Sequence, residues 1–215
     1  QVGSDIDGEA DFDESGWSVA MSNDGSRIAI GAIKRYSSDD RRGYVRVYEW
    51  DEDGSSWTQV GNDIDGEAAN DTSGYSVAMS SDGSRIAIGT PYNDGNGDNS
   101  GHVRVYEWNN STSLWDKLGD DIDGEAGGDI SGYSVAMNSS GNRIAIGAPY
   151  NNGNNSSSGH VRVYDYSNGS WSQVGSDIDG EAIGDNSGYS VAMSSDGTRI
   201  AIGAPYNVGV NGYNS

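Results

Sequence analysis

A nine-residue acidic motif, D-I-D-G-E-A-x-x-D, occurs four times in this chain of 215 residues. Each copy places four carboxylates around a glycine, and carboxylate oxygens spaced about a turn are the ligands that Ca²⁺ prefers. Clustered carboxylates also repel one another unless a cation lies between them. The motif therefore predicts candidate metal ligands, namely Asp5, Asp7, Glu9, Asp13, Asp63, Asp65, Glu67, Asp71, Asp121, Asp123, Glu125, Asp129, Asp177, Asp179, Glu181 and Asp185.

The same acids have a structural interpretation, which the residues favour over bound Ca²⁺. Aspartate side chains cap turns and accept bonds from backbone N–H groups. Cationic partners are also present, because seven of the 12 basic residues recur at equivalent positions. These are Arg27, Arg85, Arg143, Arg199, Arg46, Arg104 and Arg162. Both interpretations remain open at this point.

A second repeated motif, Pro-Tyr-Asn, is expected on the same face of the protein as the acidic loops. Its residues suit a sugar- or peptide-binding surface, although they are also ordinary turn residues, which is the favoured interpretation. The candidate ligand face contains Tyr92, Asn93, Tyr150, Asn151, Tyr206 and Asn207. The first copy differs, since residues 33–42 read IKRYSSDDRR. That loop is expected to pair with itself or with a neighbouring blade rather than to bind an anion.

The sequence gives little support for catalysis. The two histidines, His102 and His160, stand where the first copy has Tyr44, so we interpret them as packed strand residues. The chain has no G-x-S-x-G, HExxH or phosphate-binding glycine motif. Carboxylate pairs recur identically in every copy, which suits a scaffold better than a single glycosidase pair. We therefore predict that the chain is not an enzyme.

These motifs lie on a unit that is repeated at steps of 58, 58 and 56 residues. Each unit contains four short β-branched or aromatic segments of the type SVAM, RIAIG, VRVYEW and WTQVG, separated by turn residues. The S-x-D-G sequence after the first segment is a strong hairpin signal. Four antiparallel strands in each unit predict an all-β fold of β-propeller blades. A β-solenoid is the alternative, although its coils normally repeat every 20–30 or so residues.

The order of these segments resembles the FG-GAP repeat of integrin α-subunit propellers. The resemblance rests on G-Y-S-V-A, D-G, I-A-I-G-A-P and G-H-V-R-V-Y, and it extends over nearly the whole chain. Serine replaces the phenylalanine of the family motif in every copy, at Ser15, Ser73, Ser131 and Ser187. The calcium-binding hairpin of the family is reduced here to D-G. The calcium sites of integrins are therefore not carried over.

The repeats predict five segments along the chain. Residues 1–12 are expected to be the outer strand of a preceding blade, followed by blade 1 (13–66), blade 2 (67–124), blade 3 (125–180) and a partial blade 4 (181–215). Incomplete blades expose unpaired strand edges, which recruit other chains. We therefore expect further repeats of the same chain, or copies of it, as partners.

Composition restricts the class of protein further. The net charge of −21 opposes binding to nucleic acid, and no apolar run is long enough for a membrane helix. The chain has no cysteine and no basic, apolar leader. Candidate N-glycosylation sites occur in predicted loops, at Asn70, Asn109, Asn110, Asn138, Asn154, Asn155 and Asn168. Together with the acidic surface they predict an extracellular or cell-surface location.

The function predicted from the sequence is that of an extracellular structural or adhesive propeller protein, a protomer of a surface or matrix assembly such as a fibre. The near-identity of the copies favours this role. The alternative is a monomeric Ca²⁺-dependent adhesion module that binds glycans or surface proteins, which the divergent loop at residues 33–42 favours.

Overall fold

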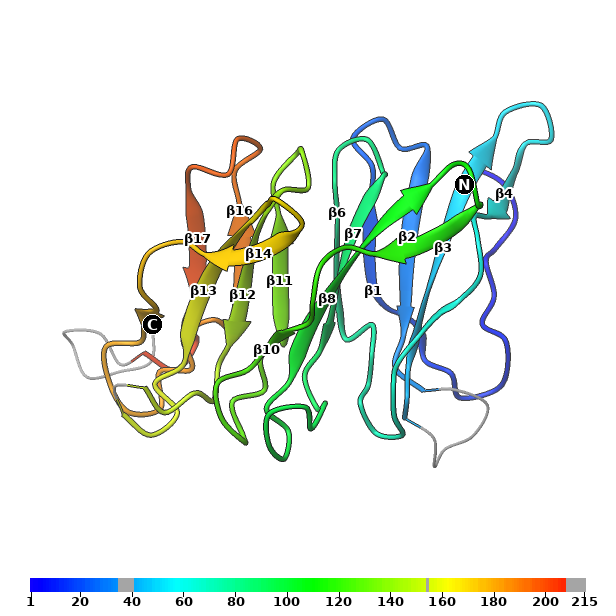
Figure 1. Cartoon of the computed structure of the whole chain (residues 1–215). Coiled ribbons are helices and arrows are strands. Elements are labelled where there is room, and N and C mark those ends of the chain that lie inside the picture. The colour runs from blue at the N-terminus through cyan, green and yellow to red at the C-terminus, as the bar shows by residue number, and fades with distance from the viewer. Residues whose placement is uncertain (35–40, 154, 208–215) are drawn as a thin grey trace.

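Seventeen short β-strands and no helix occur in the part of the chain that the computed structural model describes, residues 1–34, 41–153 and 155–207. The described residues thus contain no helix that could cross a membrane. The strands form four antiparallel sheets that stand side by side (Figure 1). This confirms the prediction of an all-β fold of propeller blades.

Each of the first three sheets uses the four predicted segments and adds a short fifth strand. The first sheet contains β1 (Ser15–Met21), β2 (Arg27–Ala32), β3 (Tyr44–Asp51), β4 (Ser56–Gln59) and β5 (Ile64–Asp65). The second contains β6 (Ser76–Met79), β7 (Arg85–Thr90), β8 (His102–Asn109), β9 (Leu114–Lys117) and β10 (Ile122–Asp123). The third contains β11 (Ser134–Met137), β12 (Arg143–Ala148), β13 (His160–Ser167), β14 (Ser170–Gln173) and β15 (Ile178–Asp179). The fourth contains β16 (Ser190–Met193) and β17 (Ile200–Gly203).

The fifth strand comes from the Ile-Asp pair inside the acidic motif. In the first sheet β4 pairs with the end of β3, and β5 pairs with its beginning, at Tyr44 and Val45. Gly61, with φ of 76°, lies in the turn that separates β4 from β5. The outer edge of each blade is therefore one interrupted strand. Its second part holds the start of the acidic motif against β3.

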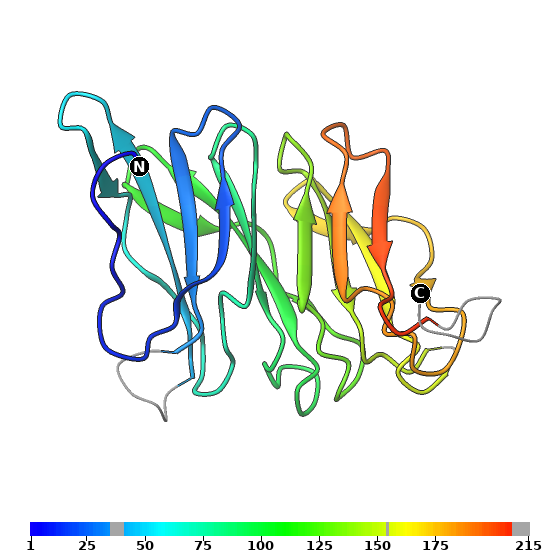
Figure 2. The same ribbon diagram turned by 180° about the vertical axis from the view of Figure 1, so that it is seen from behind.

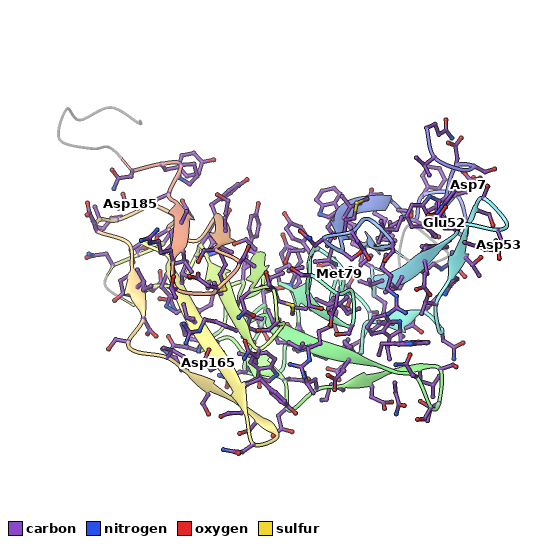
Figure 3. The ribbon with its side chains drawn as sticks, turned by 90° about the horizontal axis from the view of Figure 1, so that it is seen from above. Asp7, Glu52, Asp53, Met79, Asp165 and Asp185 are labelled. Carbon is purple, nitrogen blue, oxygen red and sulfur yellow. The ribbon has the colours of Figure 1, made fainter. Side chains whose placement is uncertain are left out.

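The sheets are arranged around an opening, with β1, β6, β11 and β16 as the innermost strands (Figure 2). These innermost strands contact their counterparts in the neighbouring sheets. Seen from above, the four sheets spread outward, and the first and last sheets lie at the two ends of an arc that does not close (Figure 3). Two end faces therefore lack the neighbour that covers the corresponding faces inside the arc.

The core lies between successive sheets and follows from the alternation of side chains along each strand. We name the two sides of a sheet by the residues of its RIAIG strand. The alanine face of the first sheet carries Ala29, Val45 and Val47, and it packs on the isoleucine face of the second sheet, which carries Ile86 and Ile88. All five side chains are almost fully buried. The second and third sheets pack in the same way.

A repeated polar contact joins the inner strand of one sheet to the segment just before the inner strand of the next. The Ser18 hydroxyl donates to the Gly74 carbonyl at 2.6 Å, and Ser76 and Ser134 make the same bond to the next sheet at 2.8 Å. A Cβ on Gly31 would collide with the same Gly74 carbonyl. The glycine of RIAIG is therefore required for the close approach of two sheets. We call this contact the serine–glycine seam.

An aromatic ladder runs beside the seam. Its rings are Trp17 of β1 and the tyrosines just before β6, β11 and β16, namely Tyr75, Tyr133 and Tyr189, with successive centroids 5.4, 4.9 and 4.9 Å apart. Burial raises the pKa of the Tyr133 phenol well above its usual range, and hydrogen bonds to its two neighbouring tyrosines act in the same direction. The phenol of Tyr133 therefore remains uncharged at any physiological pH.

Candidate functional site

The last aspartate of each acidic motif is a buried structural residue. The Asp71 carboxylate accepts one bond from the backbone amide of Ala68 and another from the side-chain amide of Asn93, both at 3.0 Å. Asp129 and Asp185 make the same pairs with Asn151 and Asn207. The acidic loop and the Pro-Tyr-Asn loop thus share a face, as the sequence predicts. Their Asp and Asn side chains bind each other.

In blade 1 an arginine binds Asp63, which is the first aspartate of the second acidic motif. Asp63 accepts from Nε and Nη2 of Arg46, at 2.8 and 3.3 Å, and Arg46 also forms an ion pair with Glu9. Tyr44, two residues before this arginine, donates its hydroxyl to Asp13 at 2.9 Å. The acids around blade 1 are therefore held by Arg46 and Tyr44, in line with the structural interpretation.

The second and third repeats use the arginine differently. Arg104 and Arg162 donate Nη2 to backbone carbonyls, those of Asp65 and Asp123, at 2.9 and 2.7 Å. Each guanidinium also lies near a glutamate, with Nη1 3.4 Å from Glu67 in one case and 3.8 Å from Glu125 in the other. The aspartates equivalent to Asp63 take other partners. Lys117 binds Asp121 at 2.9 Å, and Gln173 binds Asp177 at 2.7 Å.

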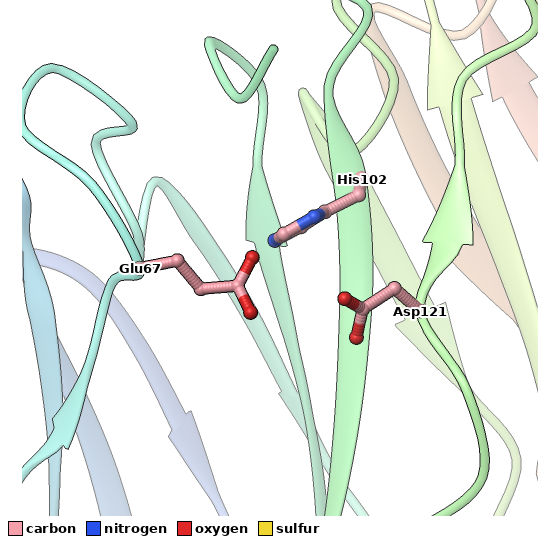
Figure 4. A group of neighbouring side chains, drawn as sticks. All are labelled: Glu67, His102 and Asp121. Atoms are coloured by element: carbon pink, nitrogen blue, oxygen red, sulfur yellow. The ribbon is translucent and has the colours of Figure 1, made fainter. Parts of the chain in front are cut away.

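Where the arginine binds a backbone carbonyl, a group of potential metal ligands forms. There are two such groups among the described residues, one on each of two neighbouring blades. The first contains Glu67, His102 and Asp121 (Figure 4), and the second contains the equivalent Glu125, His160 and Asp177. Within each group the three ligand atoms lie within 4.8 Å of one another. Either group could hold a metal ion. Each takes its two acids from consecutive motifs, whereas the sequence had suggested that the four acids of one motif would act together.

Three different elements position the first group. Glu67 lies in the loop after β5, His102 is the first residue of β8, and Asp121 precedes β10. The β5 and β10 strands pair with the third strands of adjacent sheets, so the packing of one sheet on the next brings the two acids together. Figure 4 shows the imidazole ring between the two carboxylates.

Both histidines are buried and neutral. Each is only 1% exposed. Burial, with a smaller effect of Arg104, lowers the pKa of His102 to about 4, and burial together with Arg162 also lowers the pKa of His160. Nε2 of His102 and both ring nitrogens of His160 have no hydrogen-bond partner among the described residues. The expectation of packed strand residues accounts for the burial, but it missed these unpartnered nitrogens.

The remaining candidate ligands of the acidic motifs lie mostly at the surface. Asp5 accepts from the side chain of Gln1, and Asp7 and Glu181 are exposed. Asp65 and Asp123 are also exposed. In the ligand face, Tyr150 and Tyr206 are exposed and Tyr92 packs edge-on against Tyr75. Ligand binding by these residues stays a prediction.

The candidate glycosylation sites differ in accessibility. Asn70, Asn110, Asn155 and Asn168 are exposed. Asn138 is only 6% exposed, and its amide donates to Ser140 and Asn142. The side-chain amide of Asn109 donates to Asp116. Asn154 and residues 35–40 of the divergent loop lie outside the described residues.

The repeated sheets and the loops they carry define a propeller-type repeat protein. The segment at residues 63–106 matches the model of the FG-GAP repeat family. The chain therefore contains an FG-GAP repeat, which confirms the resemblance seen in the sequence. A search of curated proteins gives no match.

Solved structures with the same fold include two putative 6-phosphogluconolactonases. The one from Bacteroides uniformis superposes with a TM-score of 0.57 at 13% identity, over 87% of this chain and 47% of that chain. The one from Bacteroides fragilis gives 0.54 at 10% identity, over 86% and 40%. Hydrazine synthase of Kuenenia stuttgartiensis gives 0.51 at 16% identity, over 86% and 57%. This chain thus spans less than two thirds of each of these relatives, and at such identities the likeness shows the fold alone.

These neighbours correct one prediction. The chain was expected not to be an enzyme, because familiar catalytic motifs are missing and the carboxylates repeat identically. That prediction is wrong, because the missing motifs do not exclude catalysis on this fold. Two of the structures that share the fold are named as putative 6-phosphogluconolactonases. Motifs of other folds say little about catalysis on a propeller, because a fold hosts sites of many kinds.

Proposed function

We propose that this propeller repeat protein is an extracellular structural or adhesive protein that assembles head to tail with copies of itself. In this assembly the fourth sheet of one copy packs on the first sheet of the next. The observation that supports the proposal is the exposed isoleucine face of the first sheet. In each later sheet, the equivalent face packs on the preceding sheet.

The apolar side chains of this face are much more exposed than their equivalents in the second sheet. Val19 and Met21 of β1 are 68% and 58% exposed, whereas their equivalents in the second sheet, Val77 and Met79, pack against the core. Val19, Ala20, Met21, Ile28 and Ile30 line a hollow of about 310 Å³. An apolar, recessed sheet face of this kind is typical of an interaction site.

The opposite end of the arc carries the complementary face. Ala201 of β17 is exposed, although the equivalent Ala29, Ala87 and Ala145 are each 0% exposed. The alanine face is thus uncovered at one end and the isoleucine face at the other.

Because these two faces already pack together inside the chain, a second copy is the occupant with the best match in shape and chemistry. A contact between two different faces is heterologous, and it generates either a ring or a fibre. The net charge of −21 opposes this association, and salt screens that repulsion. A saline exterior therefore favours assembly, and the exposed glycosylation sites support the same location.

Light scattering of the intact chain at increasing concentration and salt tests the proposal. We expect concentration-dependent oligomers that Met21→Lys or Ala201→Lys abolishes, because each places a charge in an end face. Leu114→Lys is the matched control, since Leu114 is 42% exposed on β9, away from both ends. A chain that stays monomeric up to about 100 μM, or three variants that behave alike, would overturn the proposal.

A calcium-dependent binding module for glycans or surface proteins is the second candidate. The observation in its favour is that acids of consecutive loops lie together, as Glu67 and Asp121 do. Added Ca²⁺ should then raise the melting temperature more than an equal ionic strength of NaCl, and Asp65→Asn should weaken that response. Equal effects of the two salts would exclude this role.

A further inference from the structure

We propose that Glu67, His102 and Asp121 bind one divalent transition-metal ion, and that Glu125, His160 and Asp177 bind a second. We take Zn²⁺ as the reference ion. The inference is independent of head-to-tail assembly, because neither group lies on an end face.

The donor set decides the class of ion. Each group offers one imidazole nitrogen and two carboxylate oxygens, the mixture that Zn²⁺ and similar ions take, whereas Ca²⁺ binds oxygen ligands. Metal–ligand bonds of about 2.0–2.2 Å place neighbouring tetrahedral ligands roughly 3.4 Å apart. The ligand atoms here lie within 4.8 Å of one another. The long, exposed glutamate can close that gap by a change of rotamer.

The unpartnered histidine nitrogens supply an independent reason for a ligand. A neutral imidazole has one ring nitrogen with a lone pair, and burying that acceptor without a donor costs free energy. Both His102 and His160 are 99% buried and carry such nitrogens among the described residues. A metal ion between the imidazole and the carboxylates satisfies the lone pair and neutralises the acids together.

The first repeat provides a natural comparison. Tyr44 replaces the histidine there, and Arg46 binds the equivalent acids Asp63 and Glu9. In the repeats that have histidine, the arginine donates instead to a backbone carbonyl. In the repeat with tyrosine, Arg46 thus neutralises both acids. In the repeats with histidine no arginine among the described residues binds this aspartate, which pairs with Lys117 or Gln173 and lies close to the imidazole.

The two groups differ in one competing cation. Lys117 pairs with Asp121 in the first group, and the neutral Gln173 occupies the equivalent place beside Asp177. The guanidinium near each glutamate is common to both. The second group therefore has the more negative surroundings, and we infer that it binds metal more tightly than the first.

Isothermal titration of the intact, metal-free chain with Zn²⁺ tests this inference. We expect two ions per chain, one after either His102→Tyr or His160→Tyr, and none after both changes. Tyrosine already occupies this position in blade 1, so the variants should fold, which circular dichroism checks. Lys117→Gln should tighten the weaker site by up to about fivefold, the range expected for removing one exposed ion pair.

Co²⁺ provides a second readout, because a nitrogen ligand changes its visible absorption. The intensity should follow the number of histidines kept, and Glu125→Gln should weaken the second site while leaving both histidines in place. Binding of Zn²⁺ that survives both histidine changes would show that surface carboxylates alone are responsible and would overturn the inference. So would the absence of Zn²⁺ binding.

Discussion

The side-chain amide of Asn93 donates to the carboxylate of Asp71 at 3.0 Å, and the same bond recurs at a separation of 22 residues in the next two repeats. The bond joins the loop after the second strand of one blade to the acidic loop that leads into that blade. It shows that the most conspicuous acidic motif in the sequence has two parts. Its last aspartate fixes the loop, and its earlier acids face neighbouring blades and solvent.

Removal of Asp71 should therefore destabilise the fold. Asp71→Ala leaves the Ala68 amide and the Asn93 side chain without their acceptor, and we expect a loss of about 2–3 kcal/mol in the free energy of unfolding measured in urea. Asp98→Ala, at an exposed position of a neighbouring loop, is the matched control and should change it by less than about 0.5 kcal/mol. Equal effects of the two changes would contradict the role assigned to Asp71.

The serine–glycine seam predicts different costs for the same substitution at two equivalent glycines. A Cβ on Gly89 meets both the Ser76 hydroxyl and the Gly132 carbonyl of the next sheet, whereas the three atoms nearest to a Cβ on Gly203 all belong to Ser190 in its own hairpin. Gly89→Ala should thus cost about 2 kcal/mol more than Gly203→Ala, as overpacking does in a close-packed core. Urea denaturation curves give the comparison, and similar midpoints would argue against the seam.

The hairpin turns predict a loss of stability in acid. The backbone amide of Ser26 and the Ser22 hydroxyl lower the pKa of Asp24 to about 2, and the Ser194 hydroxyl and the amide of Thr198 do the same for Asp196. A folded-state pKa below the unfolded value of 3.8 gives stability that is present above pH 4 and is lost as pH falls toward 2.

The third repeat suggests the variant that tests this effect. Its turn has Ser140 in place of the aspartate, and the Ser140 hydroxyl donates to Asn142. The double change Asp24→Ser and Asp196→Ser should therefore keep the hairpins while flattening the dependence of the urea midpoint on pH between 4 and 2. Parallel curves for the variant and the parent chain would show that other carboxylates cause the acid response.

Accessibility predicts which sequons carry glycans on secretion. Asn168 lies exposed in the turn between β13 and β14, and Asn138 is buried with its amide already bonded. Expression through a eukaryotic secretory pathway should therefore give a glycan at Asn168 and none at Asn138, as peptide mass spectrometry would show. A glycan on Asn138 would mean that modification precedes folding of this hairpin.

The sequence predicts the fold well because each blade is specified locally. Alternation in RIAIG separates Ile28 and Ile30 from Ala29, alternation in VRVY places Val45 and Val47 on one face, and the D-G turns set the hairpins. The metal-ligand groups could not be predicted in the same way. Glu67 and Asp121 are 54 positions apart and meet only when one sheet packs on another. The replacement of Tyr44 by histidine in later copies, with the acids retained, was the available signal.

The seam also determines how the molecule would respond to a pulling force. Each junction repeats the same bond between adjacent sheets, so resistance to extension is a series of nearly equal contacts. A blade that detaches releases 56 or 58 residues, which extend to roughly 190–210 Å. A molecule stretched along the arc would therefore lengthen in steps of about that size.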